Sequence, residues 1–179
     1  KGAFPIGPIS GKCLFAFFAE KTRAAEKRYG QTIPWYIMTS PTNDLETRSF
    51  FAGNGFFGLP EQQVRFFVQG TLPAVDYDGR IFLASKGEIA LSPDGHGGTL
   101  RALVESGALE DMEQRGIEEI SYFQVDNVLV KPLDPVFVGF HNDAGAEMSS
   151  KVLRKAFAEE KVGVVGMKNG RVGVIEYSD

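Results

Sequence analysis

The sequence predicts an α/β fold built around parallel strands. Two apolar runs, residues 33–39 and 64–69, have the length and composition of buried strands, and a helical pattern at 44–51 lies between them. A strand, a helix and a second strand at this spacing form a right-handed crossover between parallel strands. A third apolar run, residues 120–125, is expected to add another core strand to the same sheet.

The elements follow in order from local signals. Ser10 is a suitable N-cap for a first helix that runs to Tyr29 and ends at Gly30. In the first strand, Pro34 stands near the start, where its missing N–H is tolerated. The remaining predicted elements are a β-ribbon at 81–83 and 88–91, helices at 99–105, 109–115 and 135–142, and strands at 148–153, 162–167 and 171–177.

Two glycine-containing segments predict turns. Residues 53–58 match the pattern G-x-G-x-x-G, but a helix precedes them and Pro60 follows. A dinucleotide loop needs a strand before it and a helix after it, so a helix C-cap with a turn is predicted, with Phe56 and Phe57 as core anchors. Asn169-Gly170 predicts a type I′ hairpin turn between the last two strands.

Composition narrows the class of protein. The 179 residues carry 19 basic and 23 acidic side chains, a net charge of −4, and 43% of them are hydrophobic. This is one domain's worth of soluble globular sequence, without the basic patches of a nucleic-acid-binding protein. No apolar run has the roughly 20 residues of a membrane helix. The single cysteine, Cys13, is expected to be a buried structural thiol, which favours a cytoplasmic protein.

Glycine makes up about 12% of the chain, 21 residues, against a usual ~7%. The richest loop is Ser92-Pro93-Asp94-Gly95-His96-Gly97-Gly98, which leads directly into a predicted helix. Free backbone N–H groups at such a junction attract anions and polar ligand edges. The loop lacks the Lys-Ser/Thr of a P-loop, so a Walker-type site is not indicated. A ligand site and a plain tight turn both remain open.

Asp126 stands directly after the apolar run 120–125. In open α/β sheets, ligands bind beyond the carboxyl ends of the strands, and magnesium sites use one or two carboxylates together with substrate phosphates. The alternative is that Asp126 only caps the next turn through its side chain, and position alone leaves both open. A zinc site is not expected, because His96 and His141 have no Cys or carboxylate at ligand spacing.

Taken together, these segments resemble the eukaryotic-type UDP-sugar pyrophosphorylases, and most closely the UDP-N-acetylglucosamine pyrophosphorylases. The resemblance spans nearly the whole chain in order and spacing. It is carried by residues 33–40 (IPWYIMTS), 69–74 (QGTLPA), 92–98 (SPDGHGG), 111–117 (DMEQRGI), 125–131 (VDNVLVK), 162–165 (VGVV) and 175–179 (IEYSD).

The resemblance implies a Rossmann-like nucleotide-diphospho-sugar transferase fold, a mixed, mostly parallel sheet flanked by helices. It implies a uridylyltransferase that uses Mg²⁺ to join UTP and a hexose 1-phosphate into a UDP-sugar and pyrophosphate. By similarity, Gln69 and the backbone of Gly95 would bind uracil, and Asp126 would hold the metal and the nucleotide phosphates. Gly163 and Glu176 would contact the sugar.

His96 occupies the sugar-facing position of the glycine loop. The N-acetylglucosamine enzymes carry Asn there, whereas UDP-glucose and broad-specificity UDP-sugar enzymes carry His. N-acetylglucosamine 1-phosphate is the favoured acceptor, and the alternative is a glucose 1-phosphate enzyme or a broad-specificity UDP-sugar pyrophosphorylase. A non-catalytic nucleotide-sugar binding module is a third hypothesis, which retention of Gln69, Asp126 and Glu176 disfavours.

In this family a glycine-rich loop that ends in Arg is followed by Pro-Lys-Gly, and Lys1-Gly2 resembles the end of that second element. Lys1 is therefore counted with Asp126 among the catalytic residues. Residues 1–179 are interpreted as a single catalytic-domain segment without its N-terminal phosphate loop and C-terminal parts. Alone, it is expected to be inactive and poorly folded, because the edge of a parallel sheet would be exposed.

Overall fold

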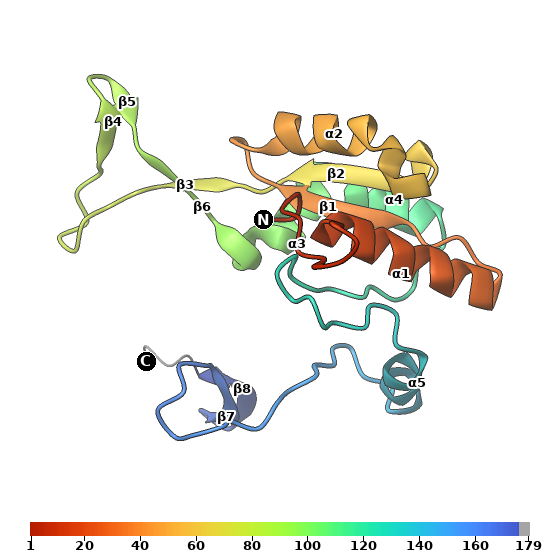
Figure 1. Ribbon diagram of the computed structural model, residues 1–179. Helices are drawn as coiled ribbons and strands as arrows, with labels where there is room; N and C mark the ends of the chain where they lie inside the picture. Colours follow the sequence, from red (N-terminus) through yellow and green to blue (C-terminus); the bar gives the residue numbers. More distant parts are fainter. Residues whose placement is uncertain (176–179) are drawn as a thin grey trace. The chain divides into compact units, whose positions relative to one another are not determined.

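Two parallel strands, β1 (Trp35–Thr39) and β2 (Val64–Val68), form the centre of the larger part of the protein (Figure 1). The computed structural model describes residues 1–175 and divides the chain into two units, Lys1–Pro135 and the part from Val136 onward. The strands pair in register from Trp35 with Val64 to Thr39 with Val68. The predicted strand–helix–strand unit with parallel strands is therefore confirmed.

Helices cover both faces of this strand pair, because side chains alternate along a strand. Ile37 and Val64 face helices α1 (Leu14–Tyr29) and α2 (Asp44–Gly53), where Ala19 and Phe51 are fully buried. Phe67 points to the other face and packs on helices α3 (Thr99–Glu105) and α4 (Ala108–Gln114). The result is a three-layer α/β/α core.

The start of α1 differs from the prediction. Ser10 is not its N-cap; Cys13 takes that position, with no side-chain cap bond. Residues 5–13 fold back on themselves through a β-bridge between Pro5 and Cys13, and Ser10 Oγ accepts a hydrogen bond from the backbone N–H of Lys12. Ser10 therefore stabilises a turn, and the helix begins later than expected. Cys13 is buried, as predicted.

The glycine-containing segment after α2 behaves as predicted. Residues Gly55–Gly58 form a short 3-10 turn, η1, in which Phe56 and Phe57 have positive φ angles of 49° and 55°. Both rings pack against Phe51, with centroids 6.3 and 5.1 Å away. A second 3-10 turn, η2 (Glu61–Gln63), leads into β2. This segment closes the core and is not a phosphate loop.

The predicted mostly parallel sheet is not seen in residues 1–175, where the other three strand pairs are antiparallel. A β-ribbon follows β2. In it, β3 (Thr71–Pro73) pairs with β6 (Leu91–Pro93), and β4 (Leu83–Ser85) pairs with β5 (Glu88–Ile89). None of residues 71–93 is buried.

The predicted core strand at residues 120–125 is also not formed. The segment is irregular and largely exposed, with Ile120 and Tyr122 more than half exposed. A strand exists only through hydrogen bonds to a neighbouring strand, and no strand of residues 1–175 pairs with this run. Its apolar composition alone was therefore an insufficient signal.

The second unit begins with helix α5 (Pro135–Asp143) and contains strands β7 (Val164–Lys168) and β8 (Arg171–Ile175). These strands form an antiparallel hairpin. Asn169 and Gly170 connect them with positive φ angles of 54° and 75°, which confirms the type I′ turn. The strand predicted at 148–153 is not formed. No helix within residues 1–175 has the length and apolar character needed to span a membrane.

Candidate active site

The first part of the site lies where the two central strands end. The backbone N–H of Gln69 donates to the carbonyl of Thr39 (2.9 Å), which extends the pairing of β1 and β2 by one residue. The carbonyl of the next residue, Gly70, accepts a hydrogen bond from the N–H of Asp94 (3.0 Å). Gln69 and Gly95 are far apart in sequence, but their chain neighbours Gly70 and Asp94 are directly hydrogen-bonded to each other.

Asp94 explains two glycines of this region. A Cβ atom at Gly70 or Gly98 would lie 2.4 or 2.0 Å from its carboxylate oxygen Oδ2, so neither position accepts a larger residue without rearrangement. Gly95 has a φ of +66°, a conformation that glycine adopts without strain. Asp94 Oδ1 is buried without a hydrogen-bond partner in the described part of the chain. The carboxylate thus fills the inside of the glycine loop.

His96 lies on the 3-10 turn η3 (Gly95–Gly98), immediately before α3. Its Nδ1 is hydrogen-bonded to the hydroxyl of Tyr122, and the two rings meet edge to face with centroids 6.0 Å apart. This contact joins the glycine loop to the irregular segment that carries Asp126.

Asp126 forms an ion pair with Lys1, whose Nζ lies 2.8 Å from Oδ2. The hydrogen bond from Lys1, together with its positive charge, holds the pKa of Asp126 below its usual value. Gly2 positions Lys1: it is buried against Phe15, and a Cβ there would lie 2.1 Å from the Phe15 ring. Both residues therefore have a structural reason: Lys1 pairs with Asp126, and Gly2 leaves no room for a side chain beside Phe15.

The segment around Asp126 is attached to α1. Lys21 Nζ donates to the carbonyls of Val128 (3.1 Å) and Val130 (2.8 Å), and partial burial lowers the pKa of its ammonium. The ring of Phe18 packs on Phe123 with centroids 4.9 Å apart. Two hydrogen bonds from Lys21 and one aromatic contact thus position an irregular segment that pairs with no strand of residues 1–175.

Five of the seven residues predicted for the site lie in the first unit, and the contacts above connect them. Gln69 and Gly95 are joined through Gly70 and Asp94. His96 contacts Tyr122, on the segment whose Asp126 pairs with Lys1. Gly163 lies in the second unit, and Glu176 lies outside the described residues. An open hollow of about 500 Å³, lined in part by Arg48, Phe56 and Phe66, includes none of these residues.

The donor set suits magnesium bound together with phosphates. Within residues 1–175 no three His, Cys, Asp or Glu side chains are close enough to hold a metal by themselves. Magnesium does not need such a cage, because one or two carboxylates, water and substrate phosphates complete its coordination. Asp126 is a half-exposed carboxylate with a lowered pKa, so it is ionised and accessible at neutral pH.

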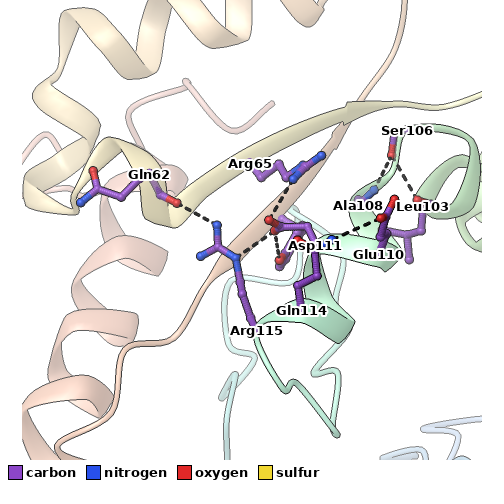
Figure 2. Close-up of polar contacts among 10 residues, drawn as sticks. Gln62, Arg65, Leu103, Ser106, Ala108, Glu110, Asp111, Gln114 and Arg115 are labelled. Carbon is purple, nitrogen blue, oxygen red and sulfur yellow. Dashed lines mark hydrogen bonds and ion pairs between the residues drawn. The ribbon is translucent and has the colours of Figure 1, made fainter.

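Asp111 on α4 is the centre of a second charged cluster, on the face that α4 covers (Figure 2). Its carboxylate accepts hydrogen bonds from Tyr36 (2.5 Å) and Arg115 (2.9 Å) and pairs with Arg65 (3.0 Å). Arg115 also donates to the carbonyl of Gln62 (3.2 Å). These contacts attach α4 to β1, β2 and the turn before β2. Residues 111–117, one of the segments that carry the family resemblance, therefore have a structural role.

Three residues of the site were missed from sequence. Tyr122 lay inside an apolar run that predicted a strand, Lys21 was one of several charged residues on α1, and Asp94 was treated only as part of a loop. The one available signal concerns Lys21. It lies on α1 beside the buried residues Phe18 and Thr22, and a charged group in such a place needs a polar partner.

Comparison with known proteins gives a consistent result. A family model described as UTP–glucose-1-phosphate uridylyltransferase matches residues 1–179. UDP-N-acetylglucosamine diphosphorylase 1 of Arabidopsis thaliana is 44% identical over 191 aligned residues, covering 100% of this chain and 38% of the plant protein. UDP-N-acetylglucosamine pyrophosphorylase of Saccharomyces cerevisiae is 44% identical over 183 residues, covering 100% and 38%. The chain thus spans less than half the length of the curated relatives it matches.

Solved structures agree with the sequence matches. The uridine diphosphate N-acetylglucosamine pyrophosphorylase of Trypanosoma brucei, solved with an inhibitor, is 33% identical with a TM-score of 0.90, over 99% of this chain and 38% of that protein. UDP-glucose pyrophosphorylase of Leishmania major superposes with a TM-score of 0.73 at 17% identity, over 98% and 40%. The second likeness concerns the fold alone.

Proposed function

Because the chain belongs to the UTP–glucose-1-phosphate uridylyltransferase family, we propose that it supplies the central catalytic part of a UDP-sugar pyrophosphorylase. The reaction transfers UMP from UTP to a sugar 1-phosphate and releases pyrophosphate. The observation that carries the proposal is the connection of Gln69, Gly95, His96, Asp126 and Lys1 through direct contacts of the segments that bear them.

Uracil recognition is assigned to the end of β2 and the glycine loop. Gln69 supplies one amide donor and one acceptor, and the backbone of Gly95 supplies a main-chain group on the opposite segment. The Gly70–Asp94 hydrogen bond fixes the spacing between them. A site that matches uracil in this way rejects other bases, because their unmatched polar groups would be buried.

Phosphate transfer is assigned to Lys1 and Asp126. An oxygen of the sugar phosphate attacks the α-phosphorus of UTP, a new P–O bond forms, and the bond to the leaving pyrophosphate breaks. Rate depends on positioning the two anions and on neutralising their charge. Lys1 brings a positive charge to this place, and Lys21 fixes the segment that carries Asp126.

Magnesium is the proposed metal, with Asp126 as its ligand. When bound, Mg²⁺ would neutralise phosphate charge and orient the pyrophosphate leaving group. Lys1 holds the Asp126 side chain in place, and the lowered pKa of Asp126 keeps its carboxylate in the anionic form that a cation requires.

The finer features of fold and sugar contact belong to the same proposal. We propose that the whole enzyme has a Rossmann-like mixed sheet, and that Gly163 and Glu176 contact the sugar. The enzyme is proposed to be cytoplasmic, with UTP and a sugar 1-phosphate as its partners and no nucleic acid among them.

N-acetylglucosamine 1-phosphate is the proposed acceptor, since enzymes named for UDP-N-acetylglucosamine are 44% identical to the entire chain. Glucose 1-phosphate is the alternative, because His96 departs from the Asn of the N-acetylglucosamine enzymes. The test is pyrophosphate release by the full-length protein with UTP, Mg²⁺ and each sugar 1-phosphate in parallel.

A kcat/KM at least tenfold higher for N-acetylglucosamine 1-phosphate is expected. If glucose 1-phosphate is preferred, the acceptor is corrected while the reaction class stands. UDP-sugar binding with no turnover of any acceptor would overturn the enzyme assignment in favour of a binding module. The variant His96→Asn is expected to change the sugar preference, and an unchanged preference would remove His96 from the sugar site.

A further inference from the structure

We infer that Tyr122 is a positioning residue that fixes the ring orientation and tautomer of His96, so that the opposite ring nitrogen, Nε2, carries the proton and faces the acceptor sugar. This inference rests on the proposed function for the identity of the substrate. The His96–Tyr122 contact itself is an observation of the structure.

The geometry leaves one nitrogen of His96 free for a ligand. Nδ1 is occupied by the Tyr122 hydroxyl, and Nε2 has no hydrogen bond to any residue of 1–175. The edge-to-face packing of the two rings, at 81° between their planes, adds a second restraint on the imidazole. An exposed histidine on a glycine-rich turn would otherwise rotate freely.

A fixed tautomer matters more for histidine than for the asparagine that the N-acetylglucosamine enzymes carry. An asparagine amide presents a donor and an acceptor side by side, whereas a neutral imidazole presents only one of these at Nε2, depending on the bond that Nδ1 makes. We assign the Tyr122 hydroxyl as the donor to Nδ1, so that Nε2–H becomes a donor. Sugar hydroxyls, phosphate oxygens and an acetamido carbonyl can all accept from it.

Tyr122 also connects two parts of the reaction. It lies four residues before Asp126, on the segment that Lys21 fastens to α1. The tyrosine thereby links the glycine loop, which holds His96, to this segment, while Lys21 and the Phe18–Phe123 contact keep the segment on α1 without it. Loss of its hydroxyl is expected to affect the sugar 1-phosphate and to leave UTP binding by Gln69 and Gly95 unaffected.

Tyr122→Phe tests this in the full-length protein, with Tyr77→Phe as the matched control. Tyr77 is fully exposed on the ribbon between β3 and β4. Each change removes one hydroxyl and keeps the ring. For Tyr122→Phe, KM for the sugar 1-phosphate is expected to rise about 3- to 10-fold, the loss of one hydrogen bond, with KM for UTP within twofold of wild type. The control is expected to change neither.

A double-mutant cycle separates positioning from a general structural effect. If Tyr122 acts through His96, then Tyr122→Phe has no further effect on KM for the sugar 1-phosphate when His96 is already Asn. An equal loss in both backgrounds would overturn the inference, as would a rise in KM for UTP that matches the rise for the sugar.

A second readout does not depend on turnover. In ¹⁵N-histidine-labelled protein, with the His96 signals assigned from His96→Asn, the ¹⁵N shifts are expected to show Nε2–H in wild type and a mixture of tautomers in Tyr122→Phe. The same tautomer population in both proteins overturns the inference, even if the enzyme is active. Absence of turnover with every sugar 1-phosphate, together with the expected shifts, would instead refute the proposed function and leave the positioning of His96 intact.

Discussion

Two aspartates of the first unit are each paired with basic side chains, but they are built for different tasks. Asp111 has two arginines and a tyrosine on its carboxylate, and its side chain is 19% exposed. The carboxylate of Asp126 has one side-chain partner within residues 1–175, Lys1, and is 48% exposed. A carboxylate whose acceptor positions are filled by protein stabilises the fold, whereas one with free oxygens and a removable partner can take a ligand. The number of protein donors on each carboxylate thus distinguishes structure from function.

The largest effect is expected from removing the charge of Asp126. Asp126→Asn keeps the size of the side chain but loses the proposed metal ligand and the pair with Lys1. Loss of a group that stabilises transition-state charge costs about 10²- to 10³-fold, so kcat/KM should fall at least about 100-fold. Initial rates over a Mg²⁺ titration in the full-length protein measure this.

Asp78→Asn is the control for that experiment, because Asp78 is an exposed ribbon residue that pairs only loosely with Arg80, at 3.6 Å. Its activity should equal that of wild type. Neither variant should change the thermal midpoint by more than about 1 °C, since exposed ion pairs contribute little to stability. Near-normal turnover by Asp126→Asn would remove this residue from the metal site.

For Asp111 we expect the opposite result, a loss of stability. Asp111→Ala leaves Arg65 and Arg115 without their counter-charge and Tyr36 without its acceptor. The expected loss is about 1–3 kcal/mol, below the cost of breaking a fully buried pair because the site is partly solvated. Thermal or urea unfolding measures it. A variant with normal stability but lost activity would contradict the division between the two aspartates.

Lys21→Met should produce an intermediate effect on the function of Asp126. The change keeps an unbranched chain of similar length and removes the donor that holds the carbonyls of Val128 and Val130. The concentration of Mg²⁺ that gives half-maximal rate should rise about 2- to 10-fold, the equivalent of one hydrogen bond. Lys12→Met is the control, because the only ion pair of Lys12 in the described part of the chain is with Glu20. An unchanged requirement for Mg²⁺ would show that Phe18 and Phe123 hold the segment without Lys21.

The sequence predicts those elements of the fold whose signals lie within a few neighbouring residues. The parallel strands around α2 and the Asn169-Gly170 turn were predicted because alternation, length and turn residues are encoded within a few positions. The strand at 120–125 failed, because a strand depends on a partner that its own sequence does not specify. The displaced N-cap failed for a similar reason, since Ser10 had a competing hydrogen bond in a turn.

The site divides in the same way. The chemistry-bearing residues were chosen by type and by resemblance, and the structure connects five of them. The residues that position them were not foreseen, because their role depends on contacts across long sequence separations: 107 and 109 residues for the two bonds of Lys21, and 26 for Tyr122 with His96. No local pattern distinguishes Tyr122 from its neighbours, and the only local signal for Lys21 is its place beside Phe18 and Thr22 on α1.

The smallest effect is expected on the stability of the Asp111 cluster at high pH. Burial, followed by the hydrogen bond to Asp111, raises the pKa of Tyr36 to about 12. The folded state therefore holds this proton more tightly than the unfolded chain, whose tyrosine has a pKa near 10. The stability it contributes is present in full below about pH 10 and is lost as the pH rises toward 12.

Tyr36→Phe should remove this dependence, because phenylalanine has no proton to lose. It should also lower stability slightly at neutral pH, through loss of the bond to Asp111. Thermal midpoints measured from pH 8 to pH 11.5 should fall more steeply in wild type than in Tyr36→Phe, and Tyr77→Phe should follow wild type. Parallel curves for wild type and Tyr36→Phe would mean that Asp111 is held by its arginines alone, and its tyrosine would then no longer distinguish it from Asp126.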